Sequence, residues 1–159
     1  MILVLLGTQN KPFSRILKAI SKEINNGNIK DKVIAQIGCT EFDDQNMELF
    51  DYKDKEELNK LIKKADVVIT HGGVGTIIEC LDYNKKIIAV PRLKKYKEHT
   101  NDHQLQIVEE FSKLGFIKAL NDFDKLPDLL KEIKTFKPAK FKSNNENFKN
   151  KVKEYIDSI

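Results

Sequence analysis

The sequence has only two cysteines, Cys39 and Cys80, which stand far apart and form no CxxC pair. This spacing argues against a disulfide framework and against a zinc site built on paired cysteines. We therefore expect two small buried thiols in a protein of a reducing compartment.

Long apolar runs are also lacking, and none reaches the ~18 residues of a membrane-spanning helix. The apolar start, MILVLL, has neither the basic segment nor the small-residue cleavage site of a leader. It ends at Gly7-Thr8, so it predicts a first strand. We expect a cytoplasmic protein whose membrane association is peripheral or made through a partner.

Positive charge is only in slight excess, with 28 lysines and arginines against 24 acidic residues and a net charge of +4. That excess is smaller than a dedicated nucleic-acid binder needs, so no nucleic-acid partner is expected. It suits an anionic small ligand or the edge of an anionic membrane, and it also fits a plain lysine-rich surface. The length of 159 residues predicts one domain.

Apolar runs of strand length alternate with segments of helical period. Strands are expected over residues 2–6, 32–37, 47–50, 67–70, 86–90 and 116–119. Helices are expected from Pro12, after Asp54 as N-cap, after Gly75, and over about residues 101–113 and 126–134. Such alternation forms a parallel sheet with helices on both faces, so the sequence predicts an α/β, Rossmann-like fold. Ligands of these sheets bind at the carboxyl ends of the strands.

The domain is expected to span residues 1–136, because Lys137-Pro138 interrupts the pattern. The remaining segment, 137–159, is interpreted as a linker and a helix over about 144–157 with apolar residues on one face. That helix either packs back on the domain or contacts a partner.

Three of the 7 glycines fall within four positions, as Gly72, Gly73 and Gly75. They follow a predicted strand and precede a predicted helix. Glycines let a backbone approach a bound group closely, and the free N–H groups of a helix N-terminus attract anions. The turn is therefore a candidate phosphate cradle, or simply a tight strand-to-helix turn. It is neither a first-strand GxGxxG nor a Walker loop, because no GK[ST] follows.

Glu79 stands three residues after Thr76, which is the spacing of a capping box. The alternative is that Glu79 accepts hydrogen bonds from a ribose diol, as acidic residues do in nucleotide sites. Spacing alone does not separate these two roles.

Several motifs occur in a characteristic order: ADVVITHGGVGTIIECL, then KKIIAVPR, then EHTNDHQLQIVEEF. Together they resemble the C-terminal, donor-binding domain of family 28 glycosyltransferases, which are GT-B enzymes that use UDP-sugars. The resemblance covers roughly residues 1–120. It is greatest for short single-domain subunits: those of two-component capsule and exopolysaccharide galactosyltransferases, and the cytosolic subunit of the dolichol-linked GlcNAc transferase.

The resemblance implies a role for each matching residue. It places the UDP diphosphate on Gly72, Gly73, Val74, Gly75 and Thr76, with Gly7 and Thr8 of the first loop facing the same site. It places the ribose on Glu79 and the donor sugar on Asp102 and Gln104. The uracil falls near Phe50 and Tyr52. For the sugar pair, the alternative is a helix start capped by Asn101 or Asp102.

The histidines, His71, His99 and His103, all lie in these loops. The resemblance implies no bound metal and no cofactor, because the UDP-sugar is a substrate. We expect His71 and His99 to bind phosphate or to organise the loop. No general base is assigned, although His71 is a weak candidate. Arg92 and Lys94–Lys97 either offset phosphate charge or form a solvated loop.

The resemblance also implies a partner, because a GT-B enzyme has a second domain that binds the acceptor. The expected activity is inverting transfer of a hexose from a UDP-sugar to a lipid-linked glycan, with a membrane-associated acceptor-binding subunit at the inner face of the plasma membrane. Galactose is the first guess for the sugar, with GlcNAc, glucose and glucuronate possible. The alternatives are a non-catalytic nucleotide-sugar-binding module and a self-sufficient homo-oligomeric enzyme.

Overall fold

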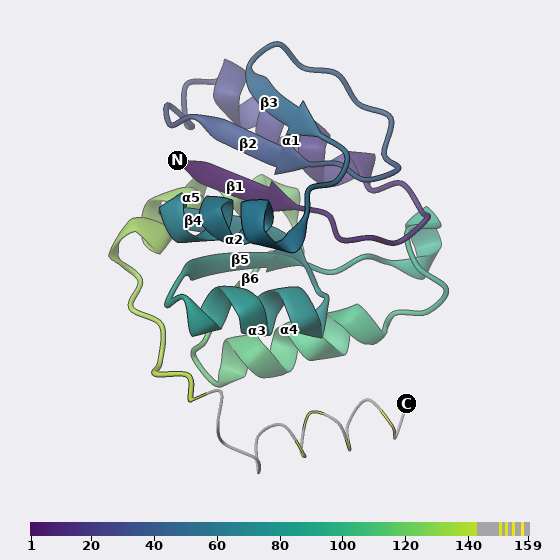
Figure 1. The fold of residues 1–159 in the computed structure, drawn as a ribbon, viewed down its shortest axis with the longest axis vertical. Coiled ribbons are helices and arrows are strands. Elements are labelled where there is room, and N and C mark those ends of the chain that lie inside the picture. The colour runs from purple at the N-terminus through teal and green to yellow at the C-terminus, as the bar shows by residue number, and fades with distance from the viewer. Residues whose placement is uncertain (143–149, 151, 153, 155–156, 158–159) are drawn as a thin grey trace.

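The computed structural model describes residues 1–142, 150, 152, 154 and 157. Within them, six parallel strands form one sheet in the order β3-β2-β1-β4-β5-β6 (Figure 1). The strands are β1 (Ile2–Leu5), β2 (Val33–Gln36), β3 (Met47–Phe50), β4 (Val67–His71), β5 (Lys86–Val90) and β6 (Lys118–Ala119). This arrangement confirms the predicted Rossmann-like class.

Successive residues of each strand point to opposite faces of the sheet. In β1, Ile2 and Val4 join one buried cluster, while Leu3 and Leu5 join the other. Since both faces are covered, every residue of β1 is buried and the strand reads as an uninterrupted apolar run. This double burial is why β1 was predictable from the sequence.

Five α-helices cover the sheet within the described residues (Figure 1). They are α1 (Ser14–Asn25), α2 (Lys55–Lys64), α3 (Val74–Asp82), α4 (His103–Lys113) and α5 (Leu126–Thr135). The first and last pack on one face, and α2, α3 and α4 pack on the other. Two short 3₁₀ helices, η1 (Lys94–Tyr96) and η2 (Phe123–Lys125), lie in loops.

Helix starts follow local hydrogen bonding. Asp54 caps α2 as expected, because its Oδ1 accepts from the Glu57 N–H at 2.8 Å. The first helix begins at Ser14 and not at Pro12. The reason is that the Phe13 N–H donates to Thr40 Oγ1 at 3.0 Å, which fixes this residue outside the helix.

The strand order reverses beside β1, whose neighbours are β2 and β4. Leu5 pairs with Thr70 in register, so the loops that follow these two strands leave the sheet side by side. A crevice opens at such a reversal point, at the carboxyl ends of the strands. The topology therefore brings the Gly7-Thr8 loop and the glycine turn together.

The segment after α5 lies against the face that carries α4. Ala139 N–H donates to Gly115 O at 2.9 Å, and Phe141 packs edge-on against Phe116 with ring centroids 5.5 Å apart. Val152 is also packed against this cluster. Most of the helix expected over 144–157 lies outside the described residues, so the division at residue 136 stays a prediction. None of the described helices is long and apolar enough to cross a membrane.

Candidate functional site

A groove of about 810 Å³ opens where the loops after β1 and β4 meet α3 and the start of α2. Its volume falls within the range of small-molecule sites. The lining includes both backbone turns and side chains of α2 and α3. Its residues are Gly7, Thr8, Gln36, Tyr52, Lys53, Lys55, Leu58, Asn59, His71, Gly75, Thr76, Ile78, Glu79, Asp82 and Tyr83.

The three glycines of the turn have different surroundings. A Cβ on Gly72 would come within 2.8 Å of the Gln104 Cβ, and one on Gly73 within 2.2 Å of His71 Nε2. A Cβ on Gly75 would meet no atom within 4 Å. Packing against α4 and against the histidine therefore accounts for the first two glycines. Only Gly75 faces open space, and it lines the groove.

The expected start of α3 was wrong by two residues. The helix begins at Val74, with Gly73 in the cap position and no side-chain cap. Thr76 is therefore inside the first turn, so the capping-box interpretation of Thr76 and Glu79 is wrong. The first hydrogen bond of the helix runs from Ile77 N–H to Gly73 O at 3.1 Å. The N–H groups before it lie at the groove end of α3, as in an anion site.

Thr76 and Glu79 are three residues apart on α3, so they share one face of the helix. Both line the groove and are half-buried. With the cap role gone, the Glu79 carboxylate is left facing the groove from the middle of the helix. A carboxylate in this place can accept hydrogen bonds from a diol.

His71 is 7% exposed and its ring lies beside Gly7 and Gly73. Burial, with the positive charge of Arg92 second, lowers the pKa of His71 to about 4. At neutral pH the ring is therefore uncharged. Its Nδ1 lies 3.4 Å from Leu5 O, so a proton on Nδ1 leaves Nε2 as an acceptor beside the glycine turn. That acceptor suits a hydroxyl group better than the phosphate oxygen expected from the sequence.

Gly7 has a positive φ of 77°, and a Cβ here would meet the His71 ring at 2.6 Å. A larger residue would be strained in its backbone and would displace the imidazole. The first loop and the glycine turn thus meet across one histidine ring.

Gln104, expected to read the donor sugar, is buried and holds two loops together. Its Oε1 accepts from the Gly72 N–H and from the Arg92 N–H, both at 3.1 Å. It does not line the groove. The geometry therefore shows Gln104 tying the glycine turn to the end of β5.

Asp102 also lies outside the groove lining. It occupies the N-cap position of α4 without capping it, because its Oδ1 accepts from the Lys94 N–H at 2.8 Å. The His103 N–H is bonded instead by Asn101 Oδ1 at 3.1 Å. These two side chains organise the loop between β5 and α4.

Arg92 contradicts the expectation of a solvated or phosphate-facing cation, because its side chain is 1% exposed. Its guanidinium donates to Leu6 O at 2.6 Å, Lys11 O at 2.8 Å and Glu98 O at 3.3 Å. It also lies over the Phe13 ring, 4.8 Å from the centroid. One buried side chain therefore joins the loop after β1 to the loop after β5.

A second buried ion supports the same loop. Glu98 is 3% exposed, and it accepts from Arg15 Nε at 2.7 Å, from Arg15 Nη2 at 2.9 Å and from the Leu93 N–H at 3.1 Å. The sequence did not predict that Arg92 and Glu98 are buried, because a charged residue in a polar loop is ordinarily exposed. The signal available in the sequence for a buried Arg92 was its position, since Pro91-Arg92 follows a buried strand directly.

Of the two aromatic residues expected near the uracil, only Tyr52 lines the groove. Tyr52 lines it and is 53% exposed, whereas Phe50 is half-buried against the core. Sequence reasoning missed Asn59 and Tyr83, which come from α2 and from the end of α3. The Asn59 Oδ1 is buried without a hydrogen-bond partner among the described residues.

The remaining candidate groups lie elsewhere. His99 is half-buried, with Nε2 2.9 Å from Gln9 Nε2, and burial lowers its pKa. Cys80 is buried as expected, and burial raises its pKa to about 12. Cys39 is exposed, which contradicts the expectation of a buried thiol, because it sits in the loop after β2. No group of three metal-ligating side chains occurs in the part of the chain that the structure describes.

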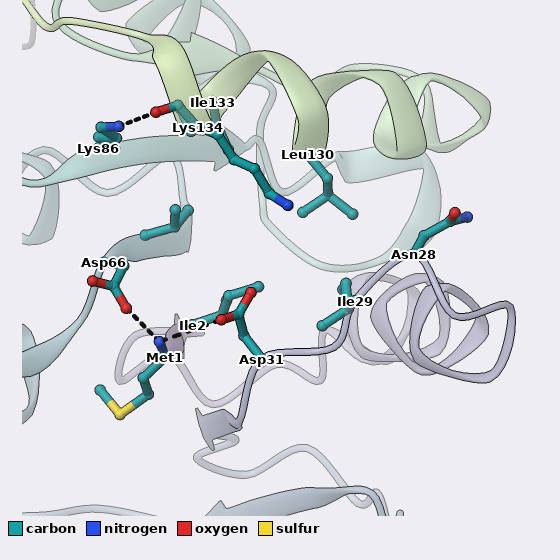
Figure 2. Close-up of a pocket in the computed structure, with 11 residues that line it drawn as sticks. Met1, Ile2, Asn28, Ile29, Asp31, Asp66, Lys86, Leu130, Ile133 and Lys134 are labelled. Atoms are coloured by element: carbon teal, nitrogen blue, oxygen red, sulfur yellow. Dashed lines mark hydrogen bonds and ion pairs between the residues drawn. The ribbon is translucent and has the colours of Figure 1, made fainter.

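A second pocket of about 310 Å³ lies at the opposite edge of the sheet, beside the start of β1 (Figure 2). Figure 2 shows the Met1 ammonium paired with Asp66 and facing Asp31. The Met1 nitrogen and Asp31 Oδ1 are 3.9 Å apart. Lys86 Nζ bonds the Lys134 carbonyl. These charges are already partnered, so the groove at the carboxyl edge is the better candidate site.

The profile of the Glycosyltransferase family 28 C-terminal domain matches residues 1–159. The chain belongs to this family. The sequence-based recognition of a family 28 donor-binding domain is therefore confirmed. The groove lies where the strand order reverses, which is where open α/β sheets bind ligands.

Curated relatives of this family 28 chain carry one name, UDP-N-acetylglucosamine transferase subunit ALG13. The Candida albicans protein is 33% identical over 79 residues, covering 50% of this chain and 26% of the relative. The Candida glabrata protein is 42% identical over 73 residues, covering 44% and 34%. The Debaryomyces hansenii protein is 27% identical over 120 residues, covering 73% and 54%. The chain thus spans between about a quarter and about half of these relatives.

Solved structures show the same fold. A glycotransferase of kitacinnamycin matches with a TM-score of 0.63 at 21% identity, over 84% of this chain and 34% of that one. The NMR solution structure of ALG13 matches with a TM-score of 0.61 at 18% identity, over 95% and 94%. The six-stranded domain therefore corresponds to the C-terminal, Rossmann-like half of a GT-B glycosyltransferase, as predicted.

Proposed function

We propose that this chain binds a UDP-sugar in the groove at the carboxyl edge and acts as the donor-binding subunit of a two-component inverting glycosyltransferase. The observation that carries the proposal is Gly75. It is the one glycine of the turn whose missing side chain leaves open space, and it stands at the N-terminus of α3 inside the groove. Family membership makes a UDP-sugar the ligand class.

The lining residues divide among the parts of that ligand. The diphosphate lies against Gly75, Thr76 and the loop at Gly7-Thr8, where free N–H groups stabilise its charge. Glu79 accepts from the ribose diol. The base lies toward Tyr52 and the α2 side of the groove.

The donor sugar follows from the names of the relatives, so we propose UDP-N-acetylglucosamine. The galactose first inferred from the sequence, and with it a capsule or exopolysaccharide product, has no support among these relatives. Galactose stays the alternative that a donor panel tests.

A partner subunit supplies the acceptor-binding half of the proposed site. An acceptor hydroxyl attacks the anomeric carbon, the bond to the diphosphate breaks, and UDP leaves with inversion. We assign the general base to a membrane-associated acceptor subunit, since a pKa of about 4 makes His71 a weak base at neutral pH. The acceptor is then a lipid-linked glycan, and the chain works at the cytoplasmic face of the membrane through that subunit.

The direct test is calorimetric titration of the purified chain with UDP and then with UDP-N-acetylglucosamine, UDP-galactose, UDP-glucose and UDP-glucuronate, with and without EDTA. We expect binding that survives EDTA, with UDP-N-acetylglucosamine preferred once the acceptor subunit is co-expressed. A chain that binds no nucleotide, alone or with that subunit, would refute the proposal.

Gly75→Ala should weaken UDP binding by about tenfold or more, because the new Cβ occupies the space of the diphosphate. It should leave the melting temperature unchanged or slightly raised, since alanine favours a helix over glycine by up to about 1 kcal/mol. Calorimetry and thermal denaturation measure the two effects separately.

Gly73→Ala is the matched comparison, two positions earlier in the same turn. The new Cβ would lie 2.2 Å from His71 Nε2, so the main effect of this substitution should be a lower melting temperature. If Gly75→Ala and the unchanged protein bind UDP with equal affinity, the diphosphate does not lie against this turn.

Glu79→Gln should weaken UDP binding by about 1–2 kcal/mol, because a charged hydrogen-bond acceptor is replaced by a neutral one. Glu109→Gln, on the exposed side of α4, is the control and should bind UDP normally. A ribose role also predicts a smaller loss with 2′,3′-dideoxy-UDP, which lacks the diol. Unaltered UDP affinity in the Glu79 variant would mean that the carboxylate does not touch the ribose.

A further inference from the structure

The loop after β5 divides its charges between the interior and the surface. Of its two carboxylates, Glu98 is buried and turned onto Arg15, and Asp102 is exposed with its Oδ1 bonded to the Lys94 N–H. Lys94, Lys95 and Lys97 are all exposed. None of the three ammonium groups is within ion-pair distance of a carboxylate of the described residues. The surface of this loop therefore presents three ammonium groups against one carboxylate, and its excess charge is positive.

An aromatic side chain completes the basic segment, Lys94–Lys97. Tyr96 is 51% exposed, and its ring centroid lies 4.6 Å from the Arg15 guanidinium and 4.9 Å from the Lys95 ammonium. Tyrosine beside lysines is the composition of a bilayer interface, where the ring lies among the headgroups and the ammonium groups contact lipid phosphates.

The basic segment is also held in shape. Lys97 closes the turn in the left-handed region at a φ of 58°, and its N–H donates to Lys94 O at 2.8 Å. Below it, Leu93 N–H bonds Glu98 and Lys94 N–H bonds Asp102. The backbone of the segment therefore needs little ordering when it meets a flat surface.

The basic segment lies at the same edge of the sheet as the candidate groove. The short helix η1 projects from the carboxyl edge of the sheet, at the right of Figure 1, on the side to which the strands point. The candidate groove opens along the same edge. A surface that binds the basic segment would therefore face the carboxyl edge of the sheet.

We propose that Lys94–Lys97 is a direct docking surface for an anionic lipid bilayer, made by this chain without a partner. Its chemistry is three ammonium groups for lipid phosphates and one tyrosine ring for the headgroup layer. Attraction of this kind is additive, with each lysine near an anionic surface contributing about fivefold in affinity at physiological salt.

The test is co-sedimentation of the full chain with vesicles of equal parts phosphatidylglycerol and phosphatidylcholine, and with vesicles of phosphatidylcholine alone. We expect binding to the anionic vesicles only, lost on raising the salt concentration. The triple variant Lys94→Ala, Lys95→Ala, Lys97→Ala should bind on the order of 100-fold more weakly. Tyr96→Ala, which keeps the charges, should show a smaller loss.

The control variant is Lys60→Ala, Lys63→Ala, Lys64→Ala, which removes the same charge from exposed positions near the end of α2. That end leads into β4, so it lies at the opposite edge of the sheet. The control should bind vesicles like the unchanged chain. An equal loss in both triple variants, or no binding of the unchanged chain to anionic vesicles, would overturn the proposal.

Calorimetry with UDP separates this surface from the nucleotide groove. The triple variant of the basic segment should bind UDP as the unchanged chain does, and a weakened affinity would assign these lysines to the donor site instead. The vesicle measurement needs neither nucleotide nor acceptor subunit, so its failure and the failure of the proposed function are distinguishable.

Discussion

Arg92→Leu should lower the free energy of unfolding by about 3 kcal/mol or more, measured by urea denaturation at neutral pH. The substitution leaves three carbonyls without their donor, those of Leu6, Lys11 and Glu98. Each buried acceptor that loses its partner costs about 1–3 kcal/mol. Leucine recovers part of this by removing a buried charge, which is why the expected loss is smaller than three full penalties.

The effect should extend to ligand binding, because the Leu6 and Lys11 carbonyls flank the loop that carries Gly7 and Thr8. We expect UDP affinity to fall in Arg92→Leu even at temperatures where the variant is folded. Lys18→Leu, which removes an exposed cation from α1, is the control and should change stability by no more than about 0.5 kcal/mol. A loss below about 1 kcal/mol in Arg92→Leu would show that the carbonyls find other partners and that the guanidinium does not hold the loop.

His71 should make the protein acid-sensitive, with a stability loss of about 3 kcal/mol between pH 7 and pH 4 from this group alone. Its folded-state pKa of about 4 lies below the ordinary 6.5. As pH falls, the unfolded chain takes up the proton first, and unfolding becomes more favourable. The contribution is negligible above pH 6.5 and grows as pH falls toward 4.

Urea denaturation of the unchanged protein and of His71→Gln, at pH 7 and at pH 4, measures this difference. The Gln variant should lose stability at neutral pH from imperfect packing beside Gly7 and Gly73, but it should be less sensitive to acid. Exposed carboxylates titrate in both proteins and cancel in the comparison. Parallel pH curves for the two proteins, or an imidazole signal of His71 that titrates near 6.5 by NMR, would contradict the buried neutral ring.

The sequence determined the sheet and its class, because strands buried on both faces and helices buried on one leave different periodicities. It also located the glycine turn, whose composition has a local cause. Motif order then identified the family, which the match over residues 1–159 confirms. These features depend on residues close together along the chain.

The tertiary structure alone decided what each polar residue contacts. Gly72, Gly73 and Gly75 are alike in the sequence, yet α4 crowds the first, His71 crowds the second, and only the third faces the groove. Gln104 was expected to bind the donor sugar and Arg92 to offset phosphate charge or lie in a solvated loop, and the structure shows both as buried hydrogen-bonding groups that hold the loops. Their partners lie 6 to 86 positions away, and those of Arg92 at Leu6 and Lys11 lie more than 80 away. Burial and pairing over such separations depend on which elements the fold brings together, and no local pattern of residues records that.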